Sequence, residues 1–165
     1  MKIAYCMACA RPIQKINDTH YHCPACGQDF WNNPSATAGV VIVKDDKILL
    51  AKRGVEPNKG KFDLPGGFIE FAEDPVHAAK REIEEETGMS VENLELLAAY
   101  PTIYEENDST VDLIFLARSW QGTPRPDDDV ADLVWQSRSF LDTPGFCSPY
   151  PGFHALLESR LEGGS

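Results

Sequence analysis

Long apolar runs are absent from this chain of 165 residues, in which no stretch approaches 18 consecutive apolar residues. A helix needs about 20 such residues to cross a bilayer, so we expect no membrane span. Residues 1–5 show no apolar core followed by a cleavage site, as a secretion signal would require. Internal repeats and low-complexity segments are missing as well. We therefore expect a cytoplasmic, globular protein.

Positive charge is also scarce. Lys and Arg number 15 against 26 Asp and Glu, which gives a net charge of −11. A nucleic-acid-binding surface requires a basic patch, so the composition argues against DNA or RNA as a partner. A small anionic substrate would have to be attracted locally, by metal ions and a few cations. The length suits one catalytic domain with a small attachment.

Cysteine is limited to five positions, four of which form two pairs, Cys6 with Cys9 and Cys23 with Cys26. Two residues lie between the members of each pair, and 13 residues lie between the pairs. This spacing is close to that of a zinc ribbon, in which four thiolates form a closed structural site. Disulfides or free thiols are the alternatives, and the missing secretion signal disfavours disulfides. Cys147 has no predicted role.

The zinc ribbon is predicted at residues 1–33, because Asn33 precedes Pro34 and this pair favours a turn. A unit this small buries little apolar surface, so zinc would supply most of its folding free energy. Residues 34–165 are then the catalytic domain. Its apolar patterns predict a β-hairpin at 38–43 and 48–52, strands at 62–64, 94–100, 111–118 and 132–136, and a last helix at 154–161.

The most specific pattern is the acidic run at residues 67–89, which follows a loop at 65–67. Asp74 suits a helix N-cap, Pro75 suits the first helical position, and Gly88 suits the residue after the helix. The 3.6-residue period of this helix predicts a core stripe, made of Val76, Ala79, Ile83 and Thr87.

Three glutamates of this helix, Glu82, Glu85 and Glu86, stand at i, i+3 and i+4 and therefore share one face. Unpaired carboxylates this close repel one another by roughly a few tenths of a kcal/mol unless a cation binds. Oxygen ligands at this density suit Mg²⁺ or Mn²⁺, and Mg²⁺ usually reaches a protein together with substrate phosphates. The face predicts a metal-assisted phosphate enzyme.

The run resembles the Nudix box, in which a glycine, five residues, a glutamate and seven residues precede Arg-Glu-aliphatic-x-Glu-Glu-x-Gly-aliphatic. Every specified position is matched, by Gly67, Glu73, Arg81, Glu82, Ile83, Glu85, Glu86, Gly88 and Met89. The resemblance implies an α/β fold, namely the Nudix α/β/α sandwich with a mixed sheet, here preceded by the zinc ribbon. It also implies a pyrophosphohydrolase that cleaves a nucleoside diphosphate linked to another group, by attack of water on phosphorus.

The same resemblance implies roles for individual residues. The metal ligands that it implies are Glu82, Glu85, Glu86 and the backbone carbonyl of Gly66. Glu73 and Arg81 resemble the pair that orients the ligand helix, a role that metal sites usually need. The metals would neutralise the diphosphate oxygens and lower the pKa of the attacking water.

Further acids are predicted by analogy with relatives. Asp127, Asp128 and Asp129 precede the strand that carries Trp135, where relatives often supply a metal-binding or proton-accepting acid. Asp129 is the preferred candidate, a solvated loop being the alternative. Glu105 and Glu106 are the second choice.

Substrate contacts are predicted for one cation and three aromatic residues. Arg53 ends a hairpin strand at a position where relatives often have a basic residue that touches phosphate. Tyr100, Tyr104 and Trp135 offer faces on which a base could stack. Packing in the core or at its rim is the alternative for each aromatic residue.

A zinc ribbon followed by a Nudix box resembles the bacterial NADH pyrophosphatases. Those proteins carry a Ser-Gln-Pro-Trp-Pro-Phe-Pro stretch after the box, whereas residues 98–104 here read Ala-Ala-Tyr-Pro-Thr-Ile-Tyr. ADP-ribose or an NAD(H)-like dinucleotide is favoured as substrate, with an NDP-sugar left open. A house-cleaning nucleoside triphosphate pyrophosphohydrolase and a non-catalytic nucleotide sensor are the alternative functions. A homodimer is possible by analogy.

Overall fold

The computed structural model describes residues 4–105, 108–148 and 150–163. Its elements form two separate sheets and two α-helices. The strands and helices are β1 (Gln14–Lys15), β2 (His20–His22), β3 (Asp29–Trp31), β4 (Ser35–Lys44), β5 (Lys47–Arg53), β6 (Phe62–Asp63), β7 (Gly66–Phe68), α1 (Pro75–Thr87), β8 (Ser90–Glu105), β9 (Asp108–Gln121), β10 (Val130–Ser137), the 3-10 helix η1 (Arg138–Asp142) and α2 (Phe153–Glu162).

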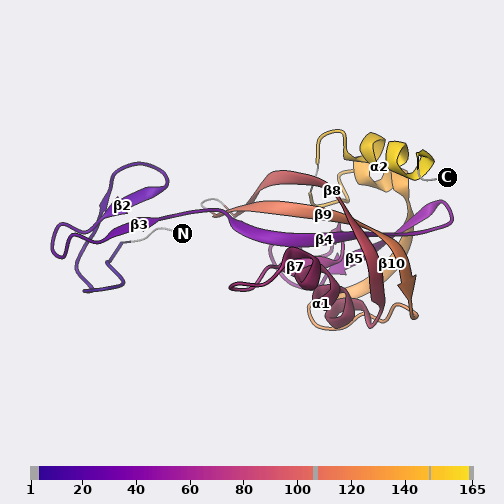
Figure 1. The fold of residues 1–165 in the computed structure, drawn as a ribbon, viewed down its shortest axis with the longest axis horizontal. Coiled ribbons are helices and arrows are strands. Elements are labelled where there is room, and N and C mark those ends of the chain that lie inside the picture. The colour runs from indigo at the N-terminus through magenta and orange to yellow at the C-terminus, as the bar shows by residue number, and fades with distance from the viewer. Residues whose placement is uncertain (1–3, 106–107, 149, 164–165) are drawn as a thin grey trace.

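The N-terminal sheet is small and antiparallel, with the strand order β1-β2-β3. Figure 1 shows β2 and β3 at one end of the molecule, apart from the second sheet, with the chain running on from β3 into β4. The division at residue 33 remains a prediction.

The second sheet has seven strands, of which five follow the order β10-β5-β4-β9-β8, while β6 pairs with β5 and β7 with β4. Strands β4 and β9 run parallel, with Ser35 opposite Thr110 and Ile42 opposite Ala117, whereas their other neighbours are antiparallel. The predicted mixed sheet is therefore confirmed.

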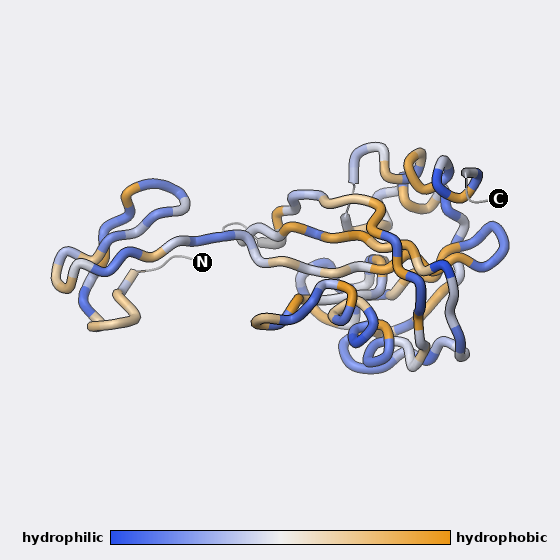
Figure 2. The backbone as a smooth tube through the Cα atoms, viewed as in Figure 1, coloured by the Kyte–Doolittle hydropathy of each residue, from blue (hydrophilic) through white to orange (hydrophobic). Residues whose placement is uncertain are grey.

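The sheet is packed on both faces because side chains alternate along a strand. Val40 and Ile42 of β4 pack in one buried cluster with Ile83 of α1, while Val41 packs in a second cluster with Leu157 of α2. Figure 1 shows the two helices on opposite sides of the sheet, and Figure 2 shows the hydrophobic residues concentrated along its strands. This arrangement confirms the α/β/α sandwich.

The ends of α1 are as predicted. The Asp74 side chain accepts hydrogen bonds from the backbone N–H groups of Val76 and His77, and Gly88 adopts φ 64° after the last turn. The predicted core stripe is wrong at one position, because Val76 is 37% exposed while Ala78 is fully buried. A period gives the direction of a side chain but not how far the covering sheet extends beneath the first turn.

The Gly-rich loop before α1 is also ordered more than the sequence suggested. Gly66 and Gly67 belong to β7, which pairs with β4 so that Gly66 lies opposite Gly39. A Cβ atom on Gly66, where φ is 146°, would lie 2.1 Å from the carbonyl oxygen of Ala38. Glycine is therefore required for this close pairing. Among the residues that the structure describes, no helix is long and apolar enough to cross a membrane.

Candidate active site

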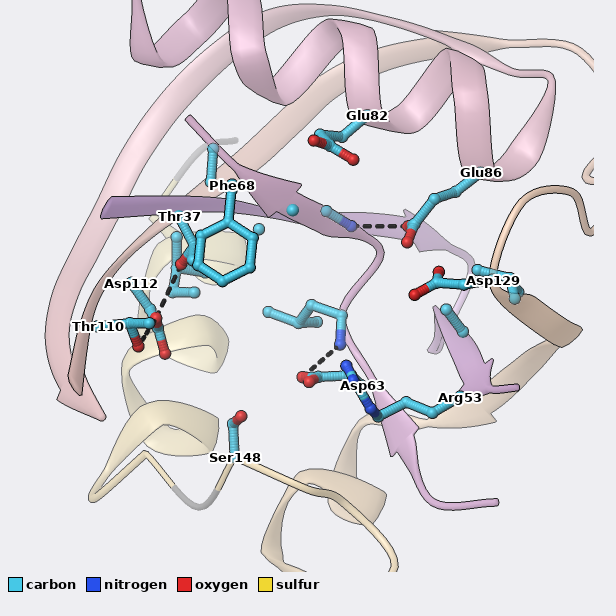
Figure 3. A pocket seen from close by; sticks show the side chains of 18 of the residues that line it. Thr37, Arg53, Asp63, Phe68, Glu82, Glu86, Thr110, Asp112, Asp129 and Ser148 are labelled. Atoms are coloured by element: carbon cyan, nitrogen blue, oxygen red, sulfur yellow. Dashed lines mark hydrogen bonds between the residues drawn. The ribbon is translucent and has the colours of Figure 1, made fainter. Parts of the chain in front are cut away.

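A cavity of about 390 Å³ opens beside α1 and β7 and is lined by residues from β4, β5, β9 and the segments before β10 and α2. Figure 3 shows Glu86 and Asp129 on one side of it and Asp112 on the opposite side. Glu82, Glu86 and Asp129 form what we call the acidic end. Thr37, Thr110, Asp112 and Tyr150, which also line the cavity, form what we call the acceptor end.

Glu82 and Glu86 reach the cavity because α1 packs directly against the glycines of β7. The backbone N–H of Gly66 donates to Oε2 of Glu86 over 2.8 Å. A Cβ atom on Gly67 would lie 2.5 Å from the Glu82 carboxylate. The two glycines thus bring the backbone close to two carboxylates, as a shared metal site requires.

The acidic end is electrostatically unfavourable without a cation. Burial, together with the carboxylates of Asp129, Glu82 and Asp63, raises the pKa of Glu86 to about 8, despite the Gly66 hydrogen bond that lowers it. Burial also raises the pKa of Glu82. A divalent cation would favour the ionised form of both groups, since an opposite charge nearby stabilises a carboxylate.

Arg81 and Glu73 are brought together as predicted. Arg81 Nε and Nη2 each lie 2.9 Å from one Glu73 carboxylate oxygen, and Nη2 also donates to the Phe68 carbonyl over 3.1 Å. The Arg81 hydrogen bonds, followed by that of the Glu70 backbone N–H, lower the pKa of Glu73 to about 2. This pair ties α1 to β7 and to the loop between them.

Arg81 also holds the helix acids. Its Nη1 donates to Glu82 over 2.8 Å and to Glu85 over 3.0 Å. The Glu85 side chain is 53% exposed, while that of Glu82 is 14% exposed. Glu85 therefore lies at the open edge of the acid face, and Glu82 and Glu86 lie deeper.

Asp129 is the loop acid that reaches the glutamates. Its charge contributes to the raised pKa of Glu86, and both side chains point toward the same part of the cavity in Figure 3. Two backbone hydrogen bonds hold its loop, one from Gly54 N–H to the Asp129 carbonyl over 2.8 Å and one from Asp127 N–H to the Glu86 carbonyl over 3.1 Å. Asp128 also lines the cavity.

Arg53 lines the cavity at the end of β5, where Figure 3 shows it beside Asp63. Its Nε donates to the Pro57 carbonyl over 2.7 Å. The sequence did not single out Asp63, whose pKa is raised to about 6 by burial. The sequence signal that could have identified Asp63 is its position, since it is an acid at the end of a short strand, just before a Gly-rich loop.

Two of the three aromatic residues predicted to stack on a base, Tyr100 and Trp135, pack against other aromatic side chains instead. Tyr100 stacks on Tyr150 with ring centroids 4.8 Å apart, and its hydroxyl donates to the Pro151 carbonyl over 3.4 Å. Trp135 packs against Trp120, with centroids 5.7 Å apart. Both residues thus occupy the packing environments considered as the alternative. The side chains of Tyr104 and Glu105, and all of Glu106, lie outside the described residues.

The acceptor end escaped sequence reasoning, although Asp112 stands within an otherwise apolar strand pattern. That acid and the neighbouring Thr110 were the only signals, because Thr37 and Tyr150 come from distant positions. Asp112 is 7% exposed and accepts hydrogen bonds from Thr37, Thr110 and Tyr150.

The four N-terminal cysteines converge as their spacing predicted. The Sγ atoms of Cys6 and Cys26 are 3.6 Å apart, as are those of Cys9 and Cys23, and all four lie within 4.8 Å of one another. Tetrahedral zinc with Zn–S bonds of about 2.3 Å separates its sulfurs by about 3.8 Å, so the cluster is compatible with structural zinc. Cys6 and Cys23 are buried, whereas Cys9 and Cys26 are exposed.

Comparison with known proteins agrees with this geometry. Residues 33–145, more than half of the chain, match the family model for the NUDIX domain. A MutT NUDIX hydrolase from Burkholderia pseudomallei has a crystal structure that superposes with a TM-score of 0.64 at 32% identity, over 76% of this chain and 97% of that one.

Two curated proteins are similar over shorter stretches. An ADP-ribose pyrophosphatase from Methanocaldococcus jannaschii is 47% identical over 68 residues, which are 41% of this chain and 40% of that protein. A NAD-capped RNA hydrolase, NudC, from Haemophilus influenzae is 32% identical over 100 residues, 59% of this chain and 38% of that protein. The chain thus spans about two fifths of the length of these curated relatives.

Proposed function

This chain belongs to the NUDIX family, and on that premise we propose that it is a Mg²⁺- or Mn²⁺-dependent pyrophosphohydrolase. Its substrate is a nucleoside diphosphate linked to a second organic group, with ADP-ribose or an NAD(H)-like dinucleotide favoured. The names of the two curated relatives support this choice, since ADP-ribose and NAD both contain a diphosphate between two organic groups.

The observation that carries the proposal is the acidic end of the cavity. Glu82 and Glu86 lie there beside Asp129, and their raised pKa values mark a cluster that a cation would stabilise. Carboxylate and carbonyl oxygens are the donors that Mg²⁺ prefers. The residues that would hold the metal are Glu82, Glu85, Glu86 and the carbonyl of Gly66. Bound there, Mg²⁺ supplies charge neutralisation at phosphate oxygens and a lowered pKa for water.

The surrounding residues position the reaction. Arg81 and Glu73 fix the acid face of α1 relative to β7. Arg53 adds a positive charge at the cavity, which attracts the diphosphate in a chain of net charge −11. The water oxygen bonds to one phosphorus, the bond from that phosphorus to the bridging oxygen breaks, and the water proton passes to the Asp129 carboxylate.

The four cysteines would hold a structural zinc ion at a distance from this chemistry. Their closed set of four sulfurs leaves no position for substrate. Zinc would instead stabilise the small N-terminal sheet.

A substrate panel tests the proposal. NADH, NAD, ADP-ribose, UDP-glucose, diadenosine polyphosphates and the common nucleoside triphosphates are incubated with Mg²⁺ or Mn²⁺, and the products are separated by chromatography. We expect two nucleoside or sugar monophosphates from the favoured substrates. Turnover of triphosphates alone, with release of pyrophosphate, would establish the house-cleaning activity instead. Tight binding of one compound without turnover would establish a sensor.

A further inference from the structure

The acceptor end of the cavity is built around Asp112, which lies on β9 directly opposite Thr37 of β4 in the parallel ladder. Figure 3 shows Thr37, Thr110 and Asp112 grouped on one side of the cavity, away from Glu86 and Asp129. The side chain of Asp112 is nearly buried, yet it lines the cavity. A buried carboxylate at a position facing a ligand site requires a set of hydrogen-bond donors.

Three hydroxyl groups supply those donors. Thr37 Oγ1 and Thr110 Oγ1 donate to Oδ1 of Asp112 over 2.7 and 2.6 Å. The Tyr150 hydroxyl donates to Oδ2 over 3.0 Å. Thr110 precedes Asp112 by two residues on the same strand, so both side chains point to the same face.

These bonds decide what the hydroxyls offer to a ligand. A hydroxyl carries one hydrogen and two lone pairs, so a hydroxyl that donates to Asp112 presents only lone pairs to the cavity. Burial, and then the negative charges of Asp63 and Asp112, raise the pKa of Tyr150 well above its usual range, so this hydroxyl keeps its proton. The acceptor end therefore accepts hydrogen bonds, does not donate them, and carries negative charge.

We propose that Asp112 is a positioning residue that sets substrate specificity: it orients the Thr37, Thr110 and Tyr150 hydroxyls so that the group bound beside them must carry no negative charge and must offer an N–H donor. The amino group of adenine and the carboxamide of nicotinamide are the two sources of this chemistry in the favoured substrates. The inference rests on the proposed function, because it places the diphosphate at the acidic end and a base at the acceptor end.

Charge supports the same orientation. A phosphate or carboxylate at the acceptor end would be repelled by the Asp112 carboxylate. It would also find no free donor among the three hydroxyls, because they already donate to Asp112. The proposed cations at the acidic end would by contrast attract the diphosphate, and Arg53, beside Asp63 in the same cavity, adds a further positive charge. The alternative is a purely structural role, in which the network only joins β4, β9 and the segment before α2. Such a network would stabilise the fold, but it would not distinguish two ligands that differ in one group.

Matched ligand pairs test the inference. ADP-ribose is compared with inosine diphosphate ribose, and NAD with nicotinamide hypoxanthine dinucleotide, because each pair exchanges the amino donor at position 6 of the purine for a carbonyl acceptor and leaves an N–H only at N1. NAD is also compared with nicotinic acid adenine dinucleotide, which exchanges the carboxamide for a carboxylate. KM and kcat are measured for each compound, and Kd is measured by calorimetry for their α,β-methylene analogues, which cannot be hydrolysed.

In at least one pair, we expect the compound that carries the adenine amino group or the carboxamide to bind the wild type more tightly. Its KM and Kd should be lower by about tenfold or more, with similar kcat. The pair that differs identifies the base that lies at the acceptor end. Asp112→Asn should reduce the difference to about twofold or less, because its amide donates and forces a hydroxyl to turn. Thr37→Val should partly reduce the same difference, because it removes one of the three hydroxyls. This second variant keeps the inference testable if Asp112→Asn does not fold. Asp132→Asn, an exposed residue on β10, is the charge-matched control.

The outcomes separate the two proposals. Equal KM and Kd within every pair, or a preference that both Asp112→Asn and Thr37→Val retain, overturns the inference while leaving hydrolysis in place. A preference in Kd that Asp112→Asn removes, in a protein that hydrolyses none of the parent compounds, supports the inference and overturns the hydrolase. If no compound binds, both are overturned.

Discussion

Replacing Glu86 with glutamine should destroy activity and, at the same time, stabilise the metal-free protein at neutral and alkaline pH. Both effects follow from the position of this carboxylate, which is 8% exposed and close to other acids. Glutamine keeps an oxygen that can accept the Gly66 hydrogen bond, but it removes the charge and a proposed metal ligand. We expect turnover at saturating Mg²⁺ to fall by a factor of at least about 100.

The stability effect has a definite sign. The pKa of Glu86 rises from 4.5 to about 8 on folding, so between these values the folded chain binds a proton that the unfolded chain releases. Stability therefore falls as the pH rises through this window and is constant above it. At about 1.4 kcal/mol for each pH unit, the cost reaches about 3 kcal/mol at pH 7.

Thermal unfolding in EDTA measures this cost. The glutamine variant should unfold about 6–12 °C above the wild type at pH 7, and at nearly the same temperature at pH 4.5. Mg²⁺ should raise the unfolding temperature of the wild type more than that of the variant. Glu84→Gln, the same change at an exposed position of α1, is the control and should show neither effect. Equal unfolding temperatures of the Glu86 variant and the wild type at pH 7, or near wild-type turnover, would refute the reasoning.

Three further results are expected. Elemental analysis should find about one zinc per chain that survives mild EDTA treatment, since thiolates hold zinc better than carboxylates hold Mg²⁺; four cysteines found as disulfides without zinc would contradict this. Gly67→Ala should lower kcat by at least about tenfold with the zinc content unchanged, because its Cβ would displace the Glu82 carboxylate that lies 2.5 Å away. Glu73→Gln should lower the unfolding temperature at pH 7, and this loss should shrink as the pH falls below 4.5 towards 2, where the wild-type carboxylate also becomes neutral; a loss independent of pH would argue against the Arg81 ion pair.

Much of the acidic end could be predicted because its information is local. The helix that carries Glu82 and Glu86 has its cap, its first proline and its terminal glycine within 15 residues, and the helical period alone places the glutamates on one face. The cysteine cluster is similar, since two closely spaced pairs restrict the four thiolates to one small unit. Predicting a mixed sheet required both the pattern of apolar residues and the family resemblance.

Other features depend on residues that only folding brings together. Asp112 meets Thr37 across a parallel ladder, at a separation of 75 residues. The sequence shows an acid in an apolar strand but cannot name its donors, because parallel pairing leaves no local signal of register. Tyr100 illustrates the same limit, since its stacking on Tyr150 depends on how the segment before α2 crosses the sheet.

By itself, then, the sequence determined the family, the cysteine cluster and the acid face of α1, because each is encoded by residue types at fixed short spacings. Only the tertiary structure decided the depth of each glutamate, the approach of Asp129 and the existence of the acceptor end. Those depend on burial and on the distance between strands, which a periodic pattern does not contain. The charge of a side chain can be read from the sequence, whereas the free energy of that charge depends on its surroundings.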